Sequence, residues 1–384
     1  MNRRLHAVVL PPGQRLFQAL AAALDGTGPA ICPLSPDLPA PALRDLLDAL
    51  APHAVETEDG LTPTAGVPVD DATAVLIATS GTTGRPKFVE LSAAALRHSA
   101  QGTLARIQAA PGDRWLCCVP TSHISGVQVL VRSLVAGTDP IIQPRFDVDA
   151  LAHTRAAHVA MVPTQLRRLL ATGADLTGLG AIVLGGAAAS PALLAEAARR
   201  GLTVHPSYGM SETCGGCVYD GVPLDGMRVK IGEDGLIRLA GPSLFTGYRL
   251  DPARTEAARD GDWFVTQDLG ELTGGRLRVL GRADDVINTG GEKVVAGEVA
   301  AALSLHPKVG DVVVVGRDDP EWGQRVTAVV VPAQTTPPAL DELRAWIRGT
   351  MPAHAAPREL EIVEAIPLLP SGKPDRERLR RSPA

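Results

Sequence analysis

The chain has 384 residues, 45% of them hydrophobic and 21% charged, and its formal net charge at pH 7 is −5. This length predicts two domains, and the composition is ordinary for a globular protein. The mild negative charge argues against a nucleic-acid partner, and no apolar run is long enough to span a bilayer. The basic first residues lack the apolar run and cleavage site of a signal peptide. We therefore expect a cytoplasmic protein without a membrane span.

The first 71 residues contain no informative motif, and the regular pattern begins at "ATAVLIA" (72–78). From there strand-like and helix-like segments alternate, with Ser92 as a candidate N-cap and Pro191 in a first helical turn. Strands are expected at 72–78, 115–120, 139–144, 158–163, 181–186 and 203–209, and helices at 92–107, 126–137, 149–157, 164–173 and 190–201. This alternation predicts an α/β fold with mostly parallel sheets covered by helices.

The pattern changes twice toward the C-terminus. After Gly232, short runs such as "GLIRLAG" and "RLRVLG" predict antiparallel hairpins, hence a small β-rich subdomain. From Asp284 onward the pattern predicts a small α+β domain of about 100 residues, with "GRADD" (281–285) as a hinge. The predicted domains are therefore 1–283 and a mobile 284–384.

A cysteine pair and a glycine-threonine loop are the most unusual local features. Five cysteines in a chain of this length are no disulfide framework, and Cys214 and Cys217 are expected to be partly buried thiols in a glycine-rich loop. A zinc site would need a second ligand pair, and Cys117 and Cys118 have the wrong spacing for one.

The loop follows the strand in "IATSGTTGRPKFVELS" (77–92). Backbone N–H groups and hydroxyls in such a loop suit an anion, and Lys87 adds a positive charge. The spacing does not fit a Walker loop, because Gly81 and Gly84 are only three apart. The residues alone leave open a different phosphate loop or a surface turn.

The loop resembles the phosphate signature of the adenylate-forming superfamily, which includes acyl-CoA synthetases, luciferases and adenylation domains. Four further segments resemble the motifs of this family in the correct order, so that the resemblance covers residues 77–379. They are "SYGMSET" (207–213), "GDWFVTQDLG" (261–270), "GRADDVINTGGEKVVAGEVA" (281–300) and "LLPSGKPDRERL" (368–379). Five ordered motifs are a specific signal.

This resemblance implies two reaction steps. A carboxylate first displaces pyrophosphate from ATP, and the thiol of CoA then displaces AMP. Glu212 would hold Mg²⁺ and is, with Ser211 and Lys373, a candidate catalytic residue. The residues implied in nucleotide binding are Thr79, Ser80, Gly81, Thr82, Thr83, Gly84, Lys87, Tyr208, Gly209, Asp268 and Arg282.

The resemblance also implies that the small domain rotates between the two steps about Asp284. Rotation would withdraw Lys373 and bring in "NTGGEK" (288–293), where Gly290, Gly291 and Lys293 would contact CoA. Glycines there would let the pantetheine chain approach the backbone.

The segments between the phosphate loop and Tyr208 are similar to the 2-succinylbenzoate–CoA ligases of menaquinone synthesis, especially compact actinobacterial ones. "HISG" (123–126) and "VPTQL" (162–166) carry most of this resemblance. An acid with an aromatic ring and two carboxylates needs a flat slot with polar contacts. Gly185, Gly186 and Ala187 are candidate wall residues, and His123, Ser125, Gln165 and Thr213 are candidate polar contacts.

Two of these assignments have plain alternatives. His123 could equally gate the pocket or be a hydrogen-bonded core histidine. Arg132 could face the second carboxylate of the substrate, but the pattern favours the surface of a helix.

The chain departs from the family pattern in three ways. Phe88 stands where the phosphate motif has glycine, Gln267 replaces another glycine, and the part before the phosphate loop is abbreviated. No departure removes a charged group, so activity is still expected.

Three other functions stay open. The chain could be a benzoate-type or medium-chain acyl-CoA ligase, or it could load a carrier protein. It could also be an inactive homologue that binds nucleotide, although the intact Glu212, Asp268, Arg282 and Lys373 argue against this. The expected partner is a small carboxylic acid, and a homodimer is left open.

Overall fold

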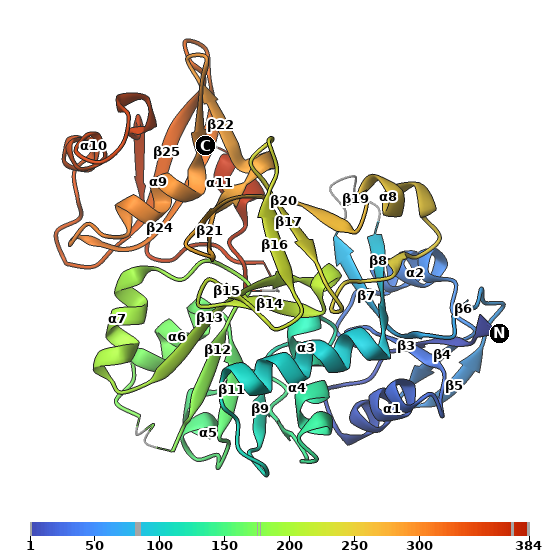
Figure 1. Ribbon diagram of the computed structural model, residues 1–384. Coiled ribbons are helices and arrows are strands. Elements are labelled where there is room, and N and C mark those ends of the chain that lie inside the picture. The colour runs from blue at the N-terminus through green and yellow to red at the C-terminus, as the bar shows by residue number, and fades with distance from the viewer. Residues whose placement is uncertain (1, 81–85, 175, 177, 370–371, 382–384) are drawn as a thin grey trace. The chain divides into compact units, whose positions relative to one another are not determined.

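The computed structural model describes residues 2–80, 86–174, 176, 178–369 and 372–381, and its ribbon is drawn in Figure 1. The chain forms two compact units. The first contains residues 1–186, 197–228 and 239–264, and the second contains residues 187–196, 229–238 and 265–384. No helix within the described ranges is long and apolar enough to cross a membrane.

The first unit contains two seven-stranded sheets. The strands of one sheet follow the order β18-β8-β7-β3-β2-β4-β5. They are β2 (Leu5–Val8), β3 (Ala30–Pro33), β4 (Ala54–Thr57), β5 (Gly60–Pro63), β7 (Thr73–Ser80), β8 (Pro86–Ser92) and β18 (Gly247–Tyr248). The strands β4, β2, β3 and β7 run parallel. The abbreviated N-terminal part therefore still forms parallel strands, connected through α1 (Gln14–Asp25) and α2 (Ala40–Leu50).

The second sheet has the order β10-β9-β11-β12-β13-β14-β15, and its first five strands are parallel as predicted. The strands are β9 (Trp115–Cys117), β10 (Ile141–Ile142), β11 (His158–Met161), β12 (Ala181–Leu184), β13 (Thr203–Met210), β14 (Gly215–Tyr219) and β15 (Val222–Pro223). The helices between β8 and β13 are α3 (Ala93–Arg106), α4 (Ile124–Val135), α5 (Val148–Ala152), α6 (Pro163–Leu170) and α7 (Pro191–Arg199). The Ser92 hydroxyl caps α3 by accepting from the Ala95 N–H at 3.1 Å, as predicted.

Helices α3 and α4 lie side by side in Figure 1. Helix α3 contacts β7 and β8 of one sheet and β14 of the other, whereas α4 contacts β9 and β11 and also α1. These helices therefore pack between the two sheets. A short antiparallel pair, β1 (Asn2–Arg3) with β6 (Val69–Asp70), completes the N-terminal part.

A third sheet of five strands confirms the predicted β-rich subdomain. It consists of β16 (Arg228–Ile231), β17 (Leu236–Ala240), β19 (Arg259–Asp260), β20 (Trp263–Thr273) and β21 (Arg276–Arg282), and α8 (Pro252–Ala257) precedes β19. The fourth sheet belongs to the second unit and has the order β23-β22-β25-β24, with β26 beside β25.

This last sheet and its helices form the α+β domain expected from the sequence. Its elements are β22 (Val286–Thr289), β23 (Glu292–Val295), α9 (Ala296–Leu303), β24 (Val309–Asp319), β25 (Gly323–Pro332), α10 (Leu340–Arg348), β26 (Glu359–Ile362) and α11 (Arg376–Arg380). A core of valine, leucine and isoleucine side chains, including Val299, Leu303 and Val330, joins the sheet to α9 and α10. The predicted domain boundary between residues 283 and 284, and the mobility of residues 284–384, stay predictions.

Candidate active site

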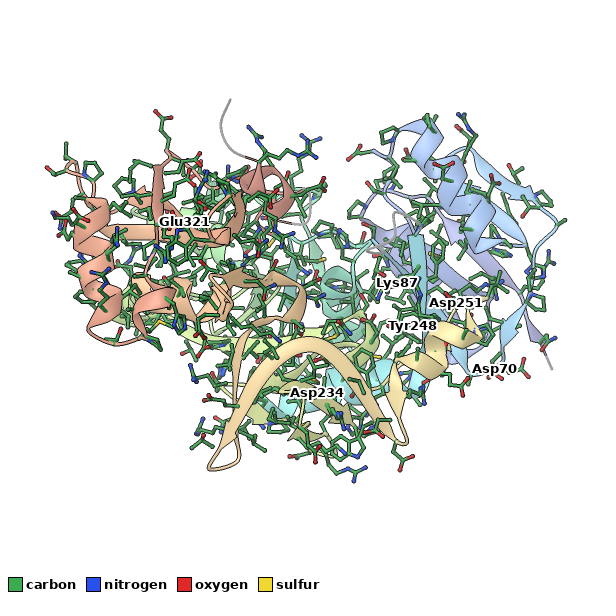
Figure 2. The ribbon with its side chains drawn as sticks, turned by 90° about the horizontal axis from the view of Figure 1, so that it is seen from above. Asp70, Lys87, Asp234, Tyr248, Asp251 and Glu321 are labelled. Carbon is green, nitrogen blue, oxygen red and sulfur yellow. The ribbon has the colours of Figure 1, made fainter. Side chains whose placement is uncertain are left out.

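Three elements of the first unit bring together a lysine, a glutamate and a tyrosine. Strand β8 carries Lys87, strand β18 carries Tyr248, and a 3₁₀ turn over Ser211–Thr213 carries Glu212. The Lys87 ammonium lies 2.8 Å from the Glu212 Oε1 atom, to which the Tyr248 hydroxyl donates at 2.9 Å. Lys87 and Tyr248 lie next to each other in Figure 2, with their terminal atoms 3.5 Å apart. We call Lys87, Glu212 and Tyr248 the carboxylate cluster.

Burial makes the carboxylate cluster electrostatically strong. Glu212 is 5% exposed and Tyr248 is 8% exposed. Burial, followed by the negative charge of Glu212 and the hydrogen bond to it, raises the pKa of the Tyr248 phenol well above its usual value. The phenol therefore stays protonated and acts as a donor to the carboxylate.

The position of Lys87 follows from the β7–β8 hairpin. Thr79 pairs with Lys87 across the ladder, and the Thr79 hydroxyl donates to the Lys87 carbonyl at 3.3 Å. Side chains alternate along a strand, so the next residue, Phe88, points to the other face. There it is 2% exposed and packs in a core with Leu5 and Leu76. The unusual Phe88 is thus a core residue of the first sheet.

Tyr248 is held by its neighbours in sequence and space. Its N–H donates to the Thr255 hydroxyl at 2.8 Å, and its ring packs on that of Phe245 with centroids 4.9 Å apart. The adjacent Arg249 is buried and donates to the Pro68 carbonyl at 2.8 Å, and it lies 3.6 Å from Glu90. The sequence analysis missed Tyr248 and Arg249. The segment "TGYR" (246–249) was a weak signal, because nothing in it reveals that β18 pairs with β8.

The turn that carries Glu212 is tightly built. A Cβ atom at Gly209 would clash with the Gly215 carbonyl, so only glycine fits between β13 and β14 at this bulge. The Thr213 hydroxyl donates to the Gly215 carbonyl at 2.6 Å and accepts from the Met210 N–H at 2.9 Å. The fully buried Thr213 therefore supports the turn, and its predicted contact with substrate stays a prediction. Tyr208 and Ser211 lie half-buried on either side of Gly209.

Cys214 and Cys217 follow this turn and are both fully buried, whereas partial burial was predicted. Cys214 caps the end of the turn and Cys217 lies in β14, so neither belongs to an exposed loop. Burial raises the pKa of the Cys217 thiol to about 12 and raises that of Cys214 as well. Both thiols therefore stay protonated.

The predicted acyl-pocket residues lie at the ends of parallel strands and at helix starts. Gly185 and Gly186 follow β12, where a Cβ atom on Gly185 would meet the Ser207 hydroxyl oxygen at 2.9 Å. His123 is half-buried at the N-cap position of α4, and Ser125 is exposed in its first turn. Carboxyl ends of parallel strands are common ligand sites.

Two further predicted acyl-pocket residues, Gln165 and Ala187, have other surroundings. The Gln165 amide accepts from the Val162 N–H at 3.0 Å and donates to the Cys118 carbonyl at 3.3 Å. It therefore fixes the start of α6, and its side-chain carbonyl and amino groups both already have backbone partners. Ala187 is exposed and begins a segment that groups with the second unit.

The prediction that Arg132 lies on a helix surface is wrong. Arg132 is 3% exposed, and its guanidinium lies over the Trp115 ring with 4.9 Å to the centroid. It donates to the Tyr219 hydroxyl at 3.5 Å, and burial lowers its pKa. The sequence could not show this, because α4 is buried on nearly all sides between other elements.

The second unit contains its own charged cluster, which we call the arginine fork. Arg282, at the end of β21, donates through Nε and Nη2 to the two carboxylate oxygens of Asp284, each at 3.1 Å. Its Nη1 atom donates to Asp268 at 3.3 Å. The hydrogen bonds from Arg282 are the main cause that lowers the pKa of Asp284. The structure thus brings together the predicted ribose-binding pair and the predicted hinge residue. Gln267 points away from Asp268 and is exposed.

The predicted CoA residues form the turn between β22 and β23. Gly290 and Gly291 have φ values of 61° and 85°, which glycine adopts without strain. The Gly290 N–H donates to the Trp322 carbonyl at 2.9 Å, and a Cβ atom at Gly290 would lie 2.7 Å from the Trp322 ring. Lys293 is exposed on β23.

Lys373 is exposed on a turn just before α11, and its carbonyl accepts from the Leu369 N–H at 2.8 Å. The predicted phosphate-loop residues Gly81, Thr82, Thr83 and Gly84, and the side chain of Ser80, lie outside the described residues.

The donor set fits a magnesium ion that is bound mainly by phosphate oxygens. Within the described ranges there is no group of three or more His, Cys, Asp or Glu side chains that could hold a metal. Mg²⁺ is commonly held by one or two carboxylates together with substrate phosphates and water. The single buried carboxylate of Glu212, beside the cationic Lys87, suits this mode of binding.

The sequence matches the AMP-binding enzyme family over residues 37–249 and the C-terminal domain of AMP-binding enzymes over residues 298–373. The chain belongs to the AMP-binding enzyme family. The family predicted from the five motifs is thereby confirmed, together with its α/β fold.

Two similar AMP-binding enzymes are named as 2-succinylbenzoate–CoA ligases. A probable 2-succinylbenzoate–CoA ligase of Mycobacterium tuberculosis is 43% identical over 82% of this chain and 86% of its own length. A 2-succinylbenzoate–CoA ligase of Bacillus velezensis is 34% identical over 84% of this chain and 72% of its own length.

Solved structures agree with these relatives. The o-succinylbenzoate CoA synthetase of Bacillus subtilis, in complex with its acyl-adenylate intermediate, superposes with a TM-score of 0.84 at 27% identity. The superposition covers 99% of this chain and 88% of that one. The same enzyme has also been solved with ATP and a magnesium ion.

Proposed function

We propose that this AMP-binding enzyme is an AMP-forming acid–thiol ligase that converts 2-succinylbenzoate to 2-succinylbenzoyl-CoA in menaquinone synthesis. Its substrates are ATP, CoA and the acid, and Mg²⁺ is its metal cofactor. The observation that carries the proposal is the carboxylate cluster, in which a buried Glu212 is held by Lys87 and Tyr248. The relatives named as 2-succinylbenzoate–CoA ligases support the choice of acid.

In the first step, a carboxylate oxygen of the acid attacks the α-phosphorus of ATP, and the bond to the bridging oxygen breaks to release pyrophosphate. The acid is ionised at neutral pH, so the protein must supply positioning and charge neutralisation rather than a base. Lys87 provides positive charge at the edge of the phosphate loop. Glu212 provides the anionic oxygen for Mg²⁺, which neutralises phosphate charge when bound.

Tyr248 has a supporting role in this proposal. Its hydroxyl donates to Glu212 and keeps the carboxylate oriented when Lys87 turns toward phosphate. A buried carboxylate without any hydrogen-bond donor would be costly. The Tyr248 phenol would still donate to the Glu212 carboxylate after Lys87 has turned away from it.

The second unit supplies the remaining nucleotide contacts in the proposal. Asp268 would accept from the ribose hydroxyls and Arg282 would assist it, as their 3.3 Å contact allows. Lys373 would steady the charge that develops between the acyl carboxylate and the α-phosphate.

In the second step, the CoA sulfur attacks the acyl carbonyl carbon, and the bond to the phosphate oxygen breaks to release AMP. The pantetheine chain would approach the backbone at Gly290 and Gly291, because neither residue has a side chain. Rotation about Asp284 stays part of the proposal, as do a homodimer and a cytoplasmic location.

The proposed acyl slot uses small residues rather than a charged partner. Gly185 and Gly186 would form its wall, and a Cβ atom at Gly185 would collide with the Ser207 hydroxyl, which donates to the Leu184 carbonyl at 3.2 Å. Arg132 is buried under Trp115 and is not a candidate for the second carboxylate. His123 and Ser125, at the start of α4, are proposed as polar contacts together with Gln165 and Thr213.

Acid-dependent exchange of pyrophosphate into ATP tests the proposal, with 2-succinylbenzoate, benzoate, octanoate and an amino acid as substrates. We expect exchange to be fastest with 2-succinylbenzoate and to be lost in Glu212→Gln but retained in Glu377→Gln, which alters an exposed carboxylate on α11. Fastest exchange with another acid would replace the substrate. No exchange with any acid would favour an inactive homologue.

A further inference from the structure

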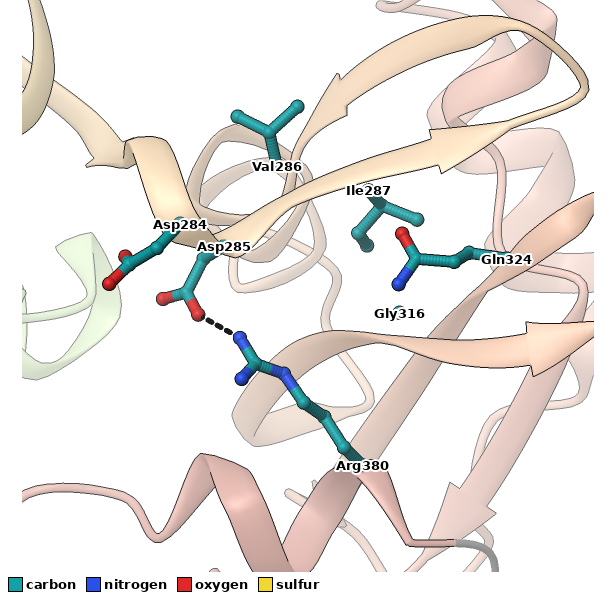
Figure 3. Close-up of a pocket in the computed structure, with 7 residues that line it drawn as sticks. All are labelled: Asp284, Asp285, Val286, Ile287, Gly316, Gln324 and Arg380. Carbon is teal, nitrogen blue, oxygen red and sulfur yellow. Dashed lines mark hydrogen bonds and ion pairs between the residues drawn. The ribbon is translucent and has the colours of Figure 1, made fainter. Parts of the chain in front are cut away.

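The residue after the predicted hinge, Asp285, contacts a different part of the second unit from its neighbour. Asp284 binds Arg282 within the arginine fork, whereas the Asp285 carboxylate faces the terminal helix α11. Its oxygens lie 3.2 Å from Arg376 Nε and 2.5 Å from Arg380 Nη2. Figure 3 shows the contact with Arg380 beside a small pocket that both residues line. The side chain of Asp285 is only 10% exposed.

Helix α11 is fixed from its other side by the fourth sheet. Arg376 also donates to the Val314 carbonyl of β24 at 3.0 Å. The buried Arg317 donates to the Leu379 carbonyl at 3.1 and 2.9 Å, and the Leu379 side chain is 4% exposed in an apolar cluster. A helix of five residues does not hold itself together, so these contacts determine its position.

The turn that carries Lys373 is continuous with α11. The Leu369 N–H donates to the Lys373 carbonyl, and the Asp375 N–H donates to the Pro367 carbonyl at 2.9 Å. Asp375 is also the N-cap of α11, since its carboxylate accepts from the Arg378 N–H at 3.0 Å. Lys373 therefore lies on a turn that leads directly into α11.

We propose that Asp285 is a positioning residue that holds α11, and with it the Lys373 turn, to the first residues after the hinge. The proposal rests on the proposed function, in which Lys373 acts in the adenylation step. Removing the carboxylate would leave Arg376 and Arg380 facing each other without a counter-charge, and like charges repel. The helix would then loosen and the lysine would lose its fixed placement.

The test uses the full-length enzyme and the variants Asp285→Asn, Arg380→Gln, Lys373→Ala and Asp285→Asn/Lys373→Ala. The matched control is Glu377→Gln, which removes the exposed ion pair between Glu377 and Arg381 on the same helix. Adenylation is measured by pyrophosphate exchange, and thioester formation is measured separately from a supplied acyl-adenylate. Amide hydrogen exchange in residues 376–381 reports the helix itself.

We expect Asp285→Asn to slow adenylation about 10-fold in kcat, to leave thioester formation within about 2-fold, and to accelerate amide exchange in α11. Arg380→Gln leaves the Arg376 contact and should have a smaller effect of the same kind. Because Asp285 acts through Lys373, the double variant should be no slower than Lys373→Ala alone, a non-additivity typical of coupled residues.

Two results would overturn the proposal. One is an equal loss of both half-reactions in Asp285→Asn, which indicates a general loss of stability. The other is a multiplicative loss in the double variant. Failure of the proposed function has a separate signal, namely no adenylation by the wild-type enzyme. In that case unchanged amide exchange of α11 in Asp285→Asn would still refute the proposal that Asp285 holds this helix.

Discussion

The carboxylate cluster and the arginine fork both contain acidic and basic side chains from family motifs, yet their surroundings differ. Glu212 is 5% exposed and receives its two partners from strands β8 and β18, far away in sequence. In the fork, the side chains of Arg282 and Asp284 are 42% and 49% exposed and only two residues apart. One cluster depends on tertiary structure, and the other depends mainly on local sequence.

This difference has an energetic meaning. An exposed ion pair contributes about 0–1 kcal/mol to stability, so Arg282 can exchange Asp284 for another partner at little cost. A buried carboxylate that loses a donor is left with an unmet hydrogen bond. We therefore expect the hydrogen bond between Tyr248 and Glu212 to be fixed and the arginine fork to be exchangeable, which suits a hinge.

The largest effect is expected from Glu212→Gln. The amide keeps the shape of the side chain but removes the charge that pairs with Lys87 and that we propose holds Mg²⁺. Loss of one preorganised charged group at a reacting centre typically costs about 10²–10³ in rate. The adenylation rate should fall by this factor at saturating Mg²⁺. An unchanged rate and an unchanged Mg²⁺ dependence would show that Glu212 does not hold the metal.

Tyr248→Phe should reduce adenylation about 10-fold, because it removes one hydrogen bond to a charged group. Tyr219→Phe is its matched control, since the Tyr219 hydroxyl contacts Thr103 in the core at 2.9 Å and does not touch Glu212. We expect the control to lower thermal stability while its Mg²⁺ dependence stays that of the wild type. Titration of the rate with Mg²⁺ separates the two, and identical curves for both variants would contradict a role for Tyr248.

Arg282→Lys should have a smaller effect, about a 5-fold rise in the KM for ATP, comparable to an exposed ion pair of about 1 kcal/mol. Lysine keeps the charge but cannot bridge Asp268 and Asp284 with a planar fork. Arg278→Lys, on the same strand β21 and paired with the exposed Glu271, should leave the KM unchanged. Equal KM values for both variants would mean that the fork does not contribute to nucleotide binding.

Gln267→Gly should have the smallest effect on activity, within about 2-fold, even though it restores the glycine of the family motif. The Gln267 side chain is exposed and points away from Asp268 on strand β20. The free energy of unfolding should fall by about 0.5–1 kcal/mol, because glycine is unfavourable within a strand. A marked gain in adenylation would instead show that Gln267 impairs the site.

Local sequence was sufficient for most strands and helices of the second sheet, because buried parallel strands are apolar runs that can be recognised directly. The motifs associated Arg282 with Asp268, whereas the contact between Arg282 and Asp284 was not predicted. The helix cap at Ser92 was equally predictable, because capping depends on residues within one turn.

The carboxylate cluster could be predicted only in part. Motifs pointed to Lys87 and Glu212, but their contact and the place of Tyr248 depend on β18 crossing to pair with β8. The prediction that Arg132 is exposed was wrong for a related reason. A guanidinium on a helix is usually exposed, and its burial under Trp115 becomes visible only when α4 is packed.

The most direct test of the central claim is incubation of the enzyme with ATP, Mg²⁺, CoA and 2-succinylbenzoate, followed by mass spectrometry of the products. The account predicts 2-succinylbenzoyl-CoA with equal amounts of AMP and pyrophosphate, formed about 10²–10³ times more slowly by Glu212→Gln. ADP and phosphate as products, or no thioester from the wild-type enzyme under conditions where a related ligase forms it, would contradict the account.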